Sequence, residues 1–390
     1  MVDESGFDSA ALQRVRDALQ ADIDKGVIDG AVIRVARHGK VALAEALGYA
    51  DRKSETRMRD DSVFKILSMT KAFTTALILE AIDLGLLSLT TRVVDIIPEF
   101  WGEDLFRSGR KERINIGHLL THRAGLSPTP RPLPYERTHR MDDTIAAICA
   151  LDAVGDPGET FNYSPAINHA LLGEIVRRVH GAAGRSIGEV FKERLFDKLE
   201  MTSTSIGPGP QNKERLVPMY SCIPEGGWLT NADVDAVSRA IESPGSEMTW
   251  VGGFSTANDV FNFAEMLRQH GTYGGHRIVS PALLRKATRL QTGDAINNLY
   301  KLLADARHWD VPPGNMGLGF ALGGAGLTVS QFGLHTSPGT FGGFGAGSTL
   351  FWVDPDSQIT FVCLTAKLLE ESENIVRFQR LSDLVASAAL

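Results

Sequence analysis

The sequence predicts an α+β protein: an antiparallel sheet flanked by helices, plus an inserted part that is mostly helical. Three observations predict this class. Strand-like patterns lie near both ends of the chain, helical spacing of apolar residues dominates the middle, and Pro- and Gly-rich loops separate the helical stretches. The simplest arrangement joins the terminal strands in one sheet, so that residues 1–65 and 252–390 form a discontinuous domain around the domain 66–251. The cleft between the two domains is the expected site.

The first elements are a helix and a hairpin. Between residues 10 and 24, apolar side chains recur every three or four positions, which is the spacing of one helix face. Residues 31–37 and 38–45 then form two apolar-rich runs joined at His38-Gly39, which indicates a β-hairpin.

The later elements follow the same logic. Residues 71–84 form an apolar run without Gly or Pro, which predicts a buried helix, and residues 167–179 predict another. Strand patterns return after about residue 315, separated by turn residues, and the chain closes with a helix. The expected strands are 317–322, 348–353 and 359–365, and the expected helices are 260–267 and 371–389.

Composition narrows the class of function. The chain has 390 residues and a net charge of −7, which argues against nucleic acid or an anionic membrane as a partner. Its most apolar window, residues 72–87, contains Glu80 and Asp83, which argues against a membrane span. The acidic N-terminus does not resemble a secretory signal, and the three cysteines lie far apart. We therefore expect a cytoplasmic protein with buried free thiols, and the oligomeric state stays open.

Ser68-Met-Thr-Lys71 is the first candidate for chemistry. A Ser and a Lys three positions apart lie on one face of a helix, where the amine can help to deprotonate the hydroxyl. The same spacing occurs at Ser62 and Ser108, but only Ser68 begins a long apolar helix, whose N-terminus favours nearby negative charge. The alternative is a serine that merely caps its helix.

Tyr163 is the candidate second base. It follows a Pro-Gly turn and precedes a helix, so a fixed loop can project its phenol. A nearby ammonium would lower the pKa of this phenol and make it a plausible base. The alternative is a Tyr that packs by its ring while its hydroxyl caps a loop.

Residues 337–348 contain five glycines in twelve positions, immediately before an expected strand. Such a run predicts close approach of the backbone to a ligand or another segment. A backbone N–H from this segment and the N–H of Ser68 would then form an oxyanion hole. The alternative is a flexible loop or a bulge.

Taken together, these motifs resemble those of the serine β-lactamase and penicillin-binding-protein-like superfamily, and class C β-lactamases in particular. The matches span about residues 65 to 355. The resemblance implies a β-lactamase/DD-peptidase-like fold with Ser68 as nucleophile and Lys71 and Tyr163 sharing the base role. The matching segments are Ser68-Met-Thr-Lys71, Tyr163-Ser-Pro165, 339–347, 119–126, 196–202, 252–257 and 348–355.

The departures from the superfamily pattern concern the substrate. Lactamases and peptidases carry Lys-Thr-Gly on the strand at the cleft, where this chain has Gly343-Phe344-Gly345 and no cation. Pro165 also stands where those enzymes often have Asn. The uncharged segment is closer to the Trp-Gly-Gly of family VIII carboxylesterases and related acyltransferases. The ungapped register from Asp354 that places Gly343-Phe344-Gly345 at this position also makes the Ala346 N–H the second oxyanion donor. Phe344 is the fallback if the strand is shifted by two residues.

Other residues near the motifs complete the expected site. We expect Gly343, Phe344, Gly345, His335, Tyr135 and Trp250 to line the substrate pocket. His118 and His122 have the spacing of a metal pair, but without a third ligand we expect neither a metal nor a cofactor.

The expected function is that of a serine hydrolase. It would act on small neutral carboxylic esters through an acyl-enzyme, with transfer to an alcohol or amine as a second outcome. One alternative is a β-lactamase or D-amino-acid peptidase or amidase, which needs a cation such as Arg131 or Arg137. Another is a catalytically silent binding protein, against which the set of Ser68, Lys71 and Tyr163 argues.

Overall fold

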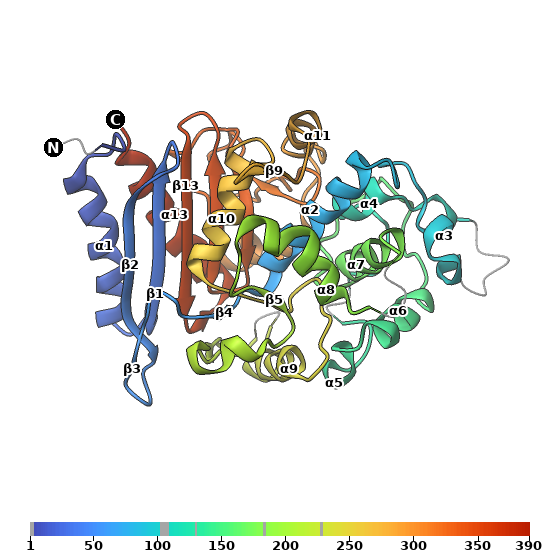
Figure 1. Cartoon of the computed structure of the whole chain (residues 1–390), viewed down its shortest axis with the longest axis horizontal. Coiled ribbons are helices and arrows are strands. Elements are labelled where there is room, and N and C mark those ends of the chain that lie inside the picture. Colours follow the sequence, from blue (N-terminus) through green and yellow to red (C-terminus); the bar gives the residue numbers. More distant parts are fainter. Residues whose placement is uncertain (1–3, 102–108, 129–130, 182–184, 227–228) are drawn as a thin grey trace.

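The protein is described by a computed structural model. The residues described are 4–101, 109–128, 131–181, 185–226 and 229–390, with the backbone alone for 210–212. These residues form a seven-stranded sheet in the order β10-β11-β12-β13-β1-β2-β3, with antiparallel neighbours throughout (Figure 1). The strands are β1 (Gly30–Arg37), β2 (Lys40–Asp51), β3 (Thr56–Arg57), β10 (Ala321–Leu322), β11 (Phe341–Gly345), β12 (Thr349–Asp354) and β13 (Ile359–Ala366).

The pairing of β1 with β13 joins the two ends of the chain in one sheet. Val32 lies opposite Leu364 in this antiparallel register, and all eight residues of β13 are buried. The expected antiparallel sheet is therefore confirmed. Strands β1, β12 and β13 lie within one residue of their predicted bounds, and β2 extends six residues beyond its predicted end. The predicted strand 317–322 is reduced to β10.

Helices cover both faces of the sheet. Helices α1 (Ser9–Asp24) and α13 (Glu371–Ser387) pack together on one face, while α10 (Ala257–Arg268) packs on the other. Neighbouring residues of β12 serve the two faces, since side chains alternate along a strand. Trp352 donates from Nε1 to Ser382 Oγ of α13 at 2.9 Å, and Phe351 packs edge-on against Phe263 of α10.

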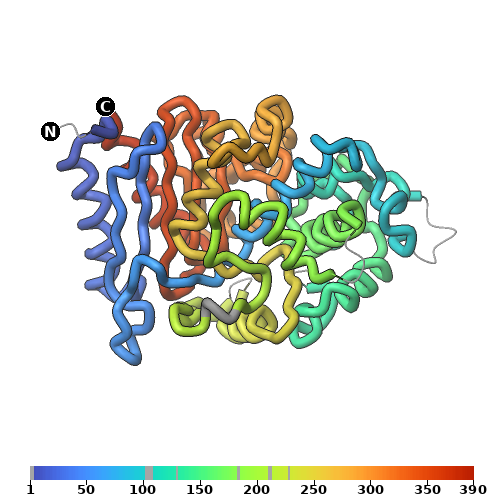
Figure 2. The backbone as a smooth tube through the Cα atoms, in the orientation of Figure 1, coloured from blue at the N-terminus to red at the C-terminus, as the bar shows by residue number. Residues whose placement is uncertain are grey.

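The helical part surrounds α2 (Thr70–Asp83), which is buried along all but its last two residues. Such a helix is a core element rather than a surface helix. It packs against α7 (Ile167–Val179) and runs from the sheet into the helical region (Figure 2). The other helices are α3 (Val93–Ile96), α4 (Ile116–Leu120), α5 (Tyr135–Thr138), α6 (Met141–Cys149), α8 (Ile187–Phe191), α9 (Asn231–Glu242), α11 (Pro281–Ala287) and α12 (Asn298–Arg307).

Further short strands pair outside the seven-stranded sheet. β4 ends just before the expected domain 66–251, β7 begins just after it, and the two strands pair with each other. β14 pairs with β6 in parallel. The bounds of the short strands are β4 (Phe64–Lys65), β5 (Ser205–Ile206), β6 (Ser221–Cys222), β7 (Gly253–Ser255), β8 (Thr272–Tyr273), β9 (His276–Arg277) and β14 (Leu368–Leu369).

Two further sequence expectations concern membranes and thiols. Within the described ranges, every helix is too short or too polar to cross a membrane. Cys149, Cys222 and Cys363 are free thiols, but Cys222 is exposed rather than buried.

Candidate active site

Ser68 lies in a single 3₁₀ turn, Leu67–Met69, that leads directly into α2. Leu67 adopts a left-handed conformation with φ of 49°, which costs a side-chain-bearing residue about 1–3 kcal/mol. The neighbouring Thr70 offsets this strain. Its hydroxyl donates to the Leu67 carbonyl at 2.6 Å and accepts from the Gly253 N–H at 3.0 Å. The turn is thus held in place from β7.

Lys71 lies one helical turn beyond the serine. Its Nζ is 3.0 Å from Ser68 Oγ and 2.9 Å from the carbonyl oxygen of Trp250. Burial lowers the pKa of Lys71 to about 7. A large fraction of the amine is therefore neutral at physiological pH and able to accept a proton.

Tyr163 reaches the same oxygen from the loop before α7. Its hydroxyl donates to Ser68 Oγ at 3.1 Å, and Lys71 Nζ is 5.4 Å from its ring centroid. Burial raises the pKa of Tyr163 to about 12, despite the hydrogen bond to Ser68. The expectation of a lowered pKa is therefore wrong, because burial is the largest influence on this phenol. The phenol is a proton donor at neutral pH, which favours Lys71 as the resting base.

His122 supports the Tyr163 loop from behind. Its Nδ1 accepts from the Ser164 N–H at 3.1 Å, and its ring centroid is 4.9 Å from that of Tyr163. Burial, with a contribution from Lys71, lowers the pKa of His122 to about 3, so the ring is neutral. His118 instead accepts the Asn115 N–H, and the described residues include no group of three or more His, Cys, Asp or Glu side chains suited to a metal.

Strand β11 passes close to the turn that carries Ser68. A Cβ on Gly345 would lie 2.2 Å from the Ile66 carbonyl oxygen, and one on Gly343 would lie 2.9 Å from the Phe351 ring. Residues 341–345 of the glycine-rich segment are thus a strand that needs glycine for close packing, rather than a flexible loop. Ala346 follows β11 and lines the same pocket as Ser68.

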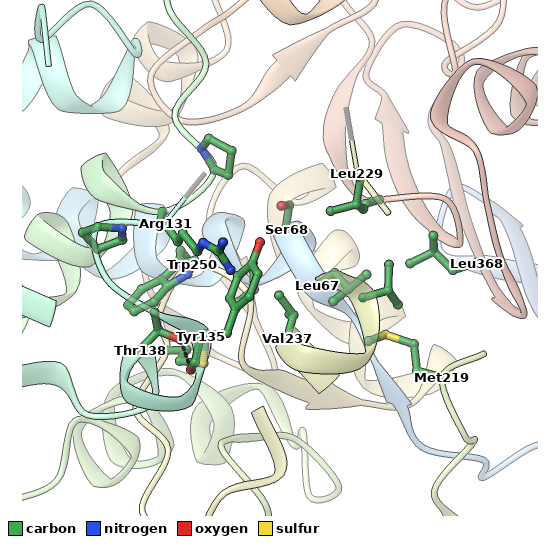
Figure 3. Close-up of a pocket in the computed structure, with 17 residues that line it drawn as sticks. Leu67, Ser68, Arg131, Tyr135, Thr138, Met219, Leu229, Val237, Trp250 and Leu368 are labelled. Carbon is green, nitrogen blue, oxygen red and sulfur yellow. Dashed lines mark hydrogen bonds between the residues drawn. The ribbon is translucent and has the colours of Figure 1, made fainter. Parts of the chain in front are cut away.

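Two pockets meet at Ser68, and it is the one described residue that lines both. The first, which we call the apolar pocket, encloses about 680 Å³ of space that is partly open to solvent. Ser68, Tyr135, Trp250 and Val237 are among the residues around it (Figure 3). Its wall is mainly aliphatic: Leu67, Met219, Leu229, Val234, Val237, Met248, Val251 and Leu368.

The second, which we call the polar pocket, encloses about 810 Å³ and is also partly open. Lys71 and Tyr163 line this pocket and not the first. Gly343 and Phe344 lie along it too. Its other polar lining residues include His122, His169, Asn297, Tyr300, Asn315 and Gln331.

The remaining predicted residues have mixed outcomes. Tyr135 and Trp250 line the apolar pocket as expected, and Gly345 packs against Ile66 rather than lining either pocket. His335 is an incorrect prediction. It is exposed, and its Nδ1 lies 2.8 Å from Ser387 Oγ at the end of α13, because the chain turns away before β11 begins.

The two arginines considered as cations that could bind a substrate carboxylate lie in different surroundings. Arg131 lines the apolar pocket with its guanidinium carbon 4.6 Å from the Tyr135 ring centroid. Arg137 instead is exposed and pairs with Asp143 at 3.3 Å. His169 and Tyr300 had no sequence signal and are brought to the site by α7 and α12.

The other Ser-x-x-Lys matches do not compete with Ser68. Ser62 Oγ accepts the Arg59 N–H, while Lys65 pairs with the Glu242 carboxylate and with Ser238. Ser108 lies outside the described residues.

The Beta-lactamase family model matches residues 15–386. The chain belongs to the beta-lactamase family. It is 30% identical over 379 residues to Protein Rv1367c of Mycobacterium tuberculosis, covering 89% of each chain. Among solved structures it resembles EstCE1, described as a hydrolase with promiscuous acyltransferase activity, with a TM-score of 0.77 and 25% identity over 96% of this chain and 98% of that one. A family VIII carboxylesterase shares the fold with a TM-score of 0.77, 22% identity and coverage of 96% and 97%.

These similarities confirm the resemblance and the fold inferred from the motifs. They also place this chain within a superfamily of serine hydrolases.

Proposed function

We propose that the protein hydrolyses carboxylic esters through an acyl-enzyme on Ser68. The observation that carries this proposal is the contact of Ser68 Oγ with both the Lys71 amine and the Tyr163 hydroxyl, at the junction of two pockets. A nucleophile within hydrogen-bond reach of a base and a proton donor is the arrangement that acyl transfer needs.

The first half-reaction follows from the two pKa shifts. Neutral Lys71 accepts the Ser68 proton while Oγ attacks the ester carbonyl carbon. The N–H groups of Ser68 and Ala346 stabilise the resulting oxyanion. When the tetrahedral intermediate collapses, the carbon–oxygen bond to the alcohol breaks. The leaving oxygen takes a proton from the Tyr163 hydroxyl, which regains one from the Lys71 ammonium. In the second half, water, an alcohol or an amine repeats the attack.

The lining of the pockets orients the ester. The leaving oxygen must face its proton donors, and both Lys71 and Tyr163 line the polar pocket. The alcohol part therefore occupies the polar pocket, and the acyl part occupies the apolar pocket. An aliphatic wall of this size suits acyl groups longer than acetyl. The similarity to EstCE1, a hydrolase with promiscuous acyltransferase activity that is 25% identical, supports acyl transfer as an accompanying activity.

A second candidate function has one specific observation in its favour. Arg131 lines the apolar pocket beside Tyr135, where a guanidinium would bind a substrate carboxylate. This would supply the cation that Gly343-Phe344-Gly345 lacks. A β-lactamase or D-amino-acid amidase of the same fold would need such a contact. The aliphatic wall favours the ester function over this one.

The test compares an ester with a lactam. We would mix the protein with p-nitrophenyl butyrate and with a chromogenic cephalosporin, and record turnover and intact mass. We expect rapid ester turnover with a butyryl adduct that Ser68→Ala abolishes, while Ser62→Ala, the matched Ser-x-x-Lys control, retains both. Efficient lactam opening that Arg131→Ala removes would favour the second candidate. Absence of any Ser68-dependent adduct would support a silent binding protein and refute the proposal.

A further inference from the structure

A buried carboxyl group lies behind the turn that carries Ala346. Glu371 is the first residue of α13 and is 7% exposed. Its Oε2 accepts a hydrogen bond of 3.0 Å from the N–H of Gly347, the residue after Ala346. The reaction scheme above gives this carboxyl no role, although burying a carboxyl group is costly.

The same turn is fixed from a second side by β14. Gly347 has φ of 63°, and a Cβ there would lie 2.3 Å from the Leu369 carbonyl oxygen. The Leu369 N–H donates to the Gly347 carbonyl at 3.1 Å. Gly347 is thus held by its carbonyl from β14 and by its amide from Glu371, and Ala346 is joined directly to that amide.

Glu371 also lies close to the apolar pocket. It lines a small cavity of about 250 Å³ that shares Ala346, Leu229 and Leu368 with the apolar pocket. Its charge contributes to the raised pKa of Tyr163. Burial raises the pKa of Glu371 itself to about 7, partly opposed by the hydrogen bond from Gly347. Both protonation states are therefore populated near neutral pH, and each offers an oxygen that can accept the Gly347 N–H.

We propose that Glu371 is a positioning residue for the oxyanion hole: by accepting the Gly347 N–H, it fixes the orientation in which Ala346 presents its own N–H to Ser68. The inference rests on the proposed function, because it assumes that Ser68 is acylated and that Ala346 is the second donor. Donors of this kind act by being fixed before charge develops, so a loosened turn weakens binding of the transition state more than binding of the substrate.

Three substitutions and a control test this role with p-nitrophenyl butyrate. Glu371→Leu removes the acceptor, Glu371→Gln keeps a neutral acceptor oxygen, and Glu371→Asp keeps the charge but withdraws the oxygen from Gly347. Glu373→Gln removes an exposed carboxylate from the same first turn of α13. We expect Glu371→Leu to lower kcat about 10- to 100-fold with KM within about twofold. Glu371→Gln and Glu373→Gln should stay close to wild type, and Glu371→Asp should lie between.

A transition-state analogue gives an independent readout. Phenylboronic acid forms a tetrahedral adduct with a serine, and its affinity should fall in Glu371→Leu by about the same factor as kcat. Wild-type kcat and boronate affinity in a folded Glu371→Leu protein, or in Glu371→Asp if the leucine variant does not fold, would overturn the role. A Gln variant as impaired as the Leu variant would do so too, because charge rather than the acceptor would then matter. Failure of the proposed function is distinguishable, because the Ser68→Ala variant would then keep the ester turnover of the wild type.

Discussion

Two lysines six positions apart show how surroundings decide the chemistry of one residue type. Lys65 Nζ contacts the Glu242 carboxylate, whereas Lys71 Nζ contacts the uncharged Ser68 Oγ and Trp250 carbonyl. Burial lowers the pKa of both, but at Lys65 the carboxylate opposes the shift. Lys71 thereby becomes a base near pH 7, and Lys65 remains a structural ion pair.

The pH dependence of ester turnover tests the role of Lys71. Because the neutral amine is the proposed base, kcat/KM should rise about tenfold per pH unit below pH 7 and level off above about pH 8. Lys71→Arg, whose guanidinium stays protonated, should lose about 100-fold or more and show no rise near pH 7. The measurement is the rate of p-nitrophenyl butyrate cleavage from pH 5.5 to 9.

The control for that profile is Glu371→Gln, since the Glu371 carboxyl has its raised pKa in the same range. The variant should retain the rise. Its disappearance in Glu371→Gln, or its persistence in Lys71→Arg, would assign the ionisation to a group other than Lys71.

At the scale of elements, α9 forms part of the wall of the pocket proposed for the acyl group. Val237 projects from this helix into the apolar pocket, as Figure 3 shows. Val237→Phe should lower kcat/KM for p-nitrophenyl hexanoate by roughly tenfold or more while changing that for the acetate little, because the added ring fills the far part of the pocket. The comparison of the two esters is the measurement.

Val376→Phe adds the same bulk at an exposed position of α13 and serves as the control. Equal losses for acetate and hexanoate in Val237→Phe would show that the acyl chain does not extend towards α9.

Elements with a strong side-chain pattern were predictable from the sequence, and those built on backbone were not. The predicted helix 167–179 matches α7 in both bounds, because its apolar spacing and its flanking residues both indicate a helix over these residues. Strand β11 was ambiguous, because three of its five residues are glycine and leave no alternation to read. These glycines are needed because Ile66 and Phe351 pack closely against them, and this contact exists only in the folded chain.

The site divides in the same way. Ser68, Lys71 and Tyr163 were predictable because their motifs have fixed spacing or fixed neighbours in the sequence, and the structure brings their polar atoms together. His335 was misplaced because its expected role rested on distance along the chain from Gly343 alone. Glu371 had no signal, since a carboxyl at the start of a helix is commonplace until its contact with Gly347 is seen.

At the scale of the whole molecule, the two faces of the sheet pack into two different hydrophobic cores. Phe351 of β12 faces α10 and the core that contains α2, whereas Trp352 faces α13. On the α13 side, Ser382 Oγ accepts from Trp352 Nε1 and donates to the Gln331 carbonyl at 2.8 Å. The packing on this face holds the C-terminal helix to strands that come from both ends of the chain.

Ser382→Ala should therefore weaken folding more than it weakens catalysis. It leaves the buried Trp352 N–H and the Gln331 carbonyl without their partner, so the free energy of unfolding should fall by about 1–3 kcal/mol. Urea unfolding measures the first effect, and kcat at 25 °C for the folded variant measures the second. Ser387→Ala, at an exposed position of α13, is the control. A large fall in kcat would mean that the two faces are coupled.

The position of Ser68 at the junction of two pockets has a consequence for the choice between hydrolysis and transfer. In the proposed reaction, once the alcohol departs, the acyl chain would still occupy the apolar pocket, and the vacated polar pocket would be the entrance for the next nucleophile. Water and an incoming alcohol then compete for the same volume beside the same proton acceptor. The partition between acid and new ester would be set by acceptor concentration and fit, and no rearrangement of the catalytic groups would be needed to change one activity into the other.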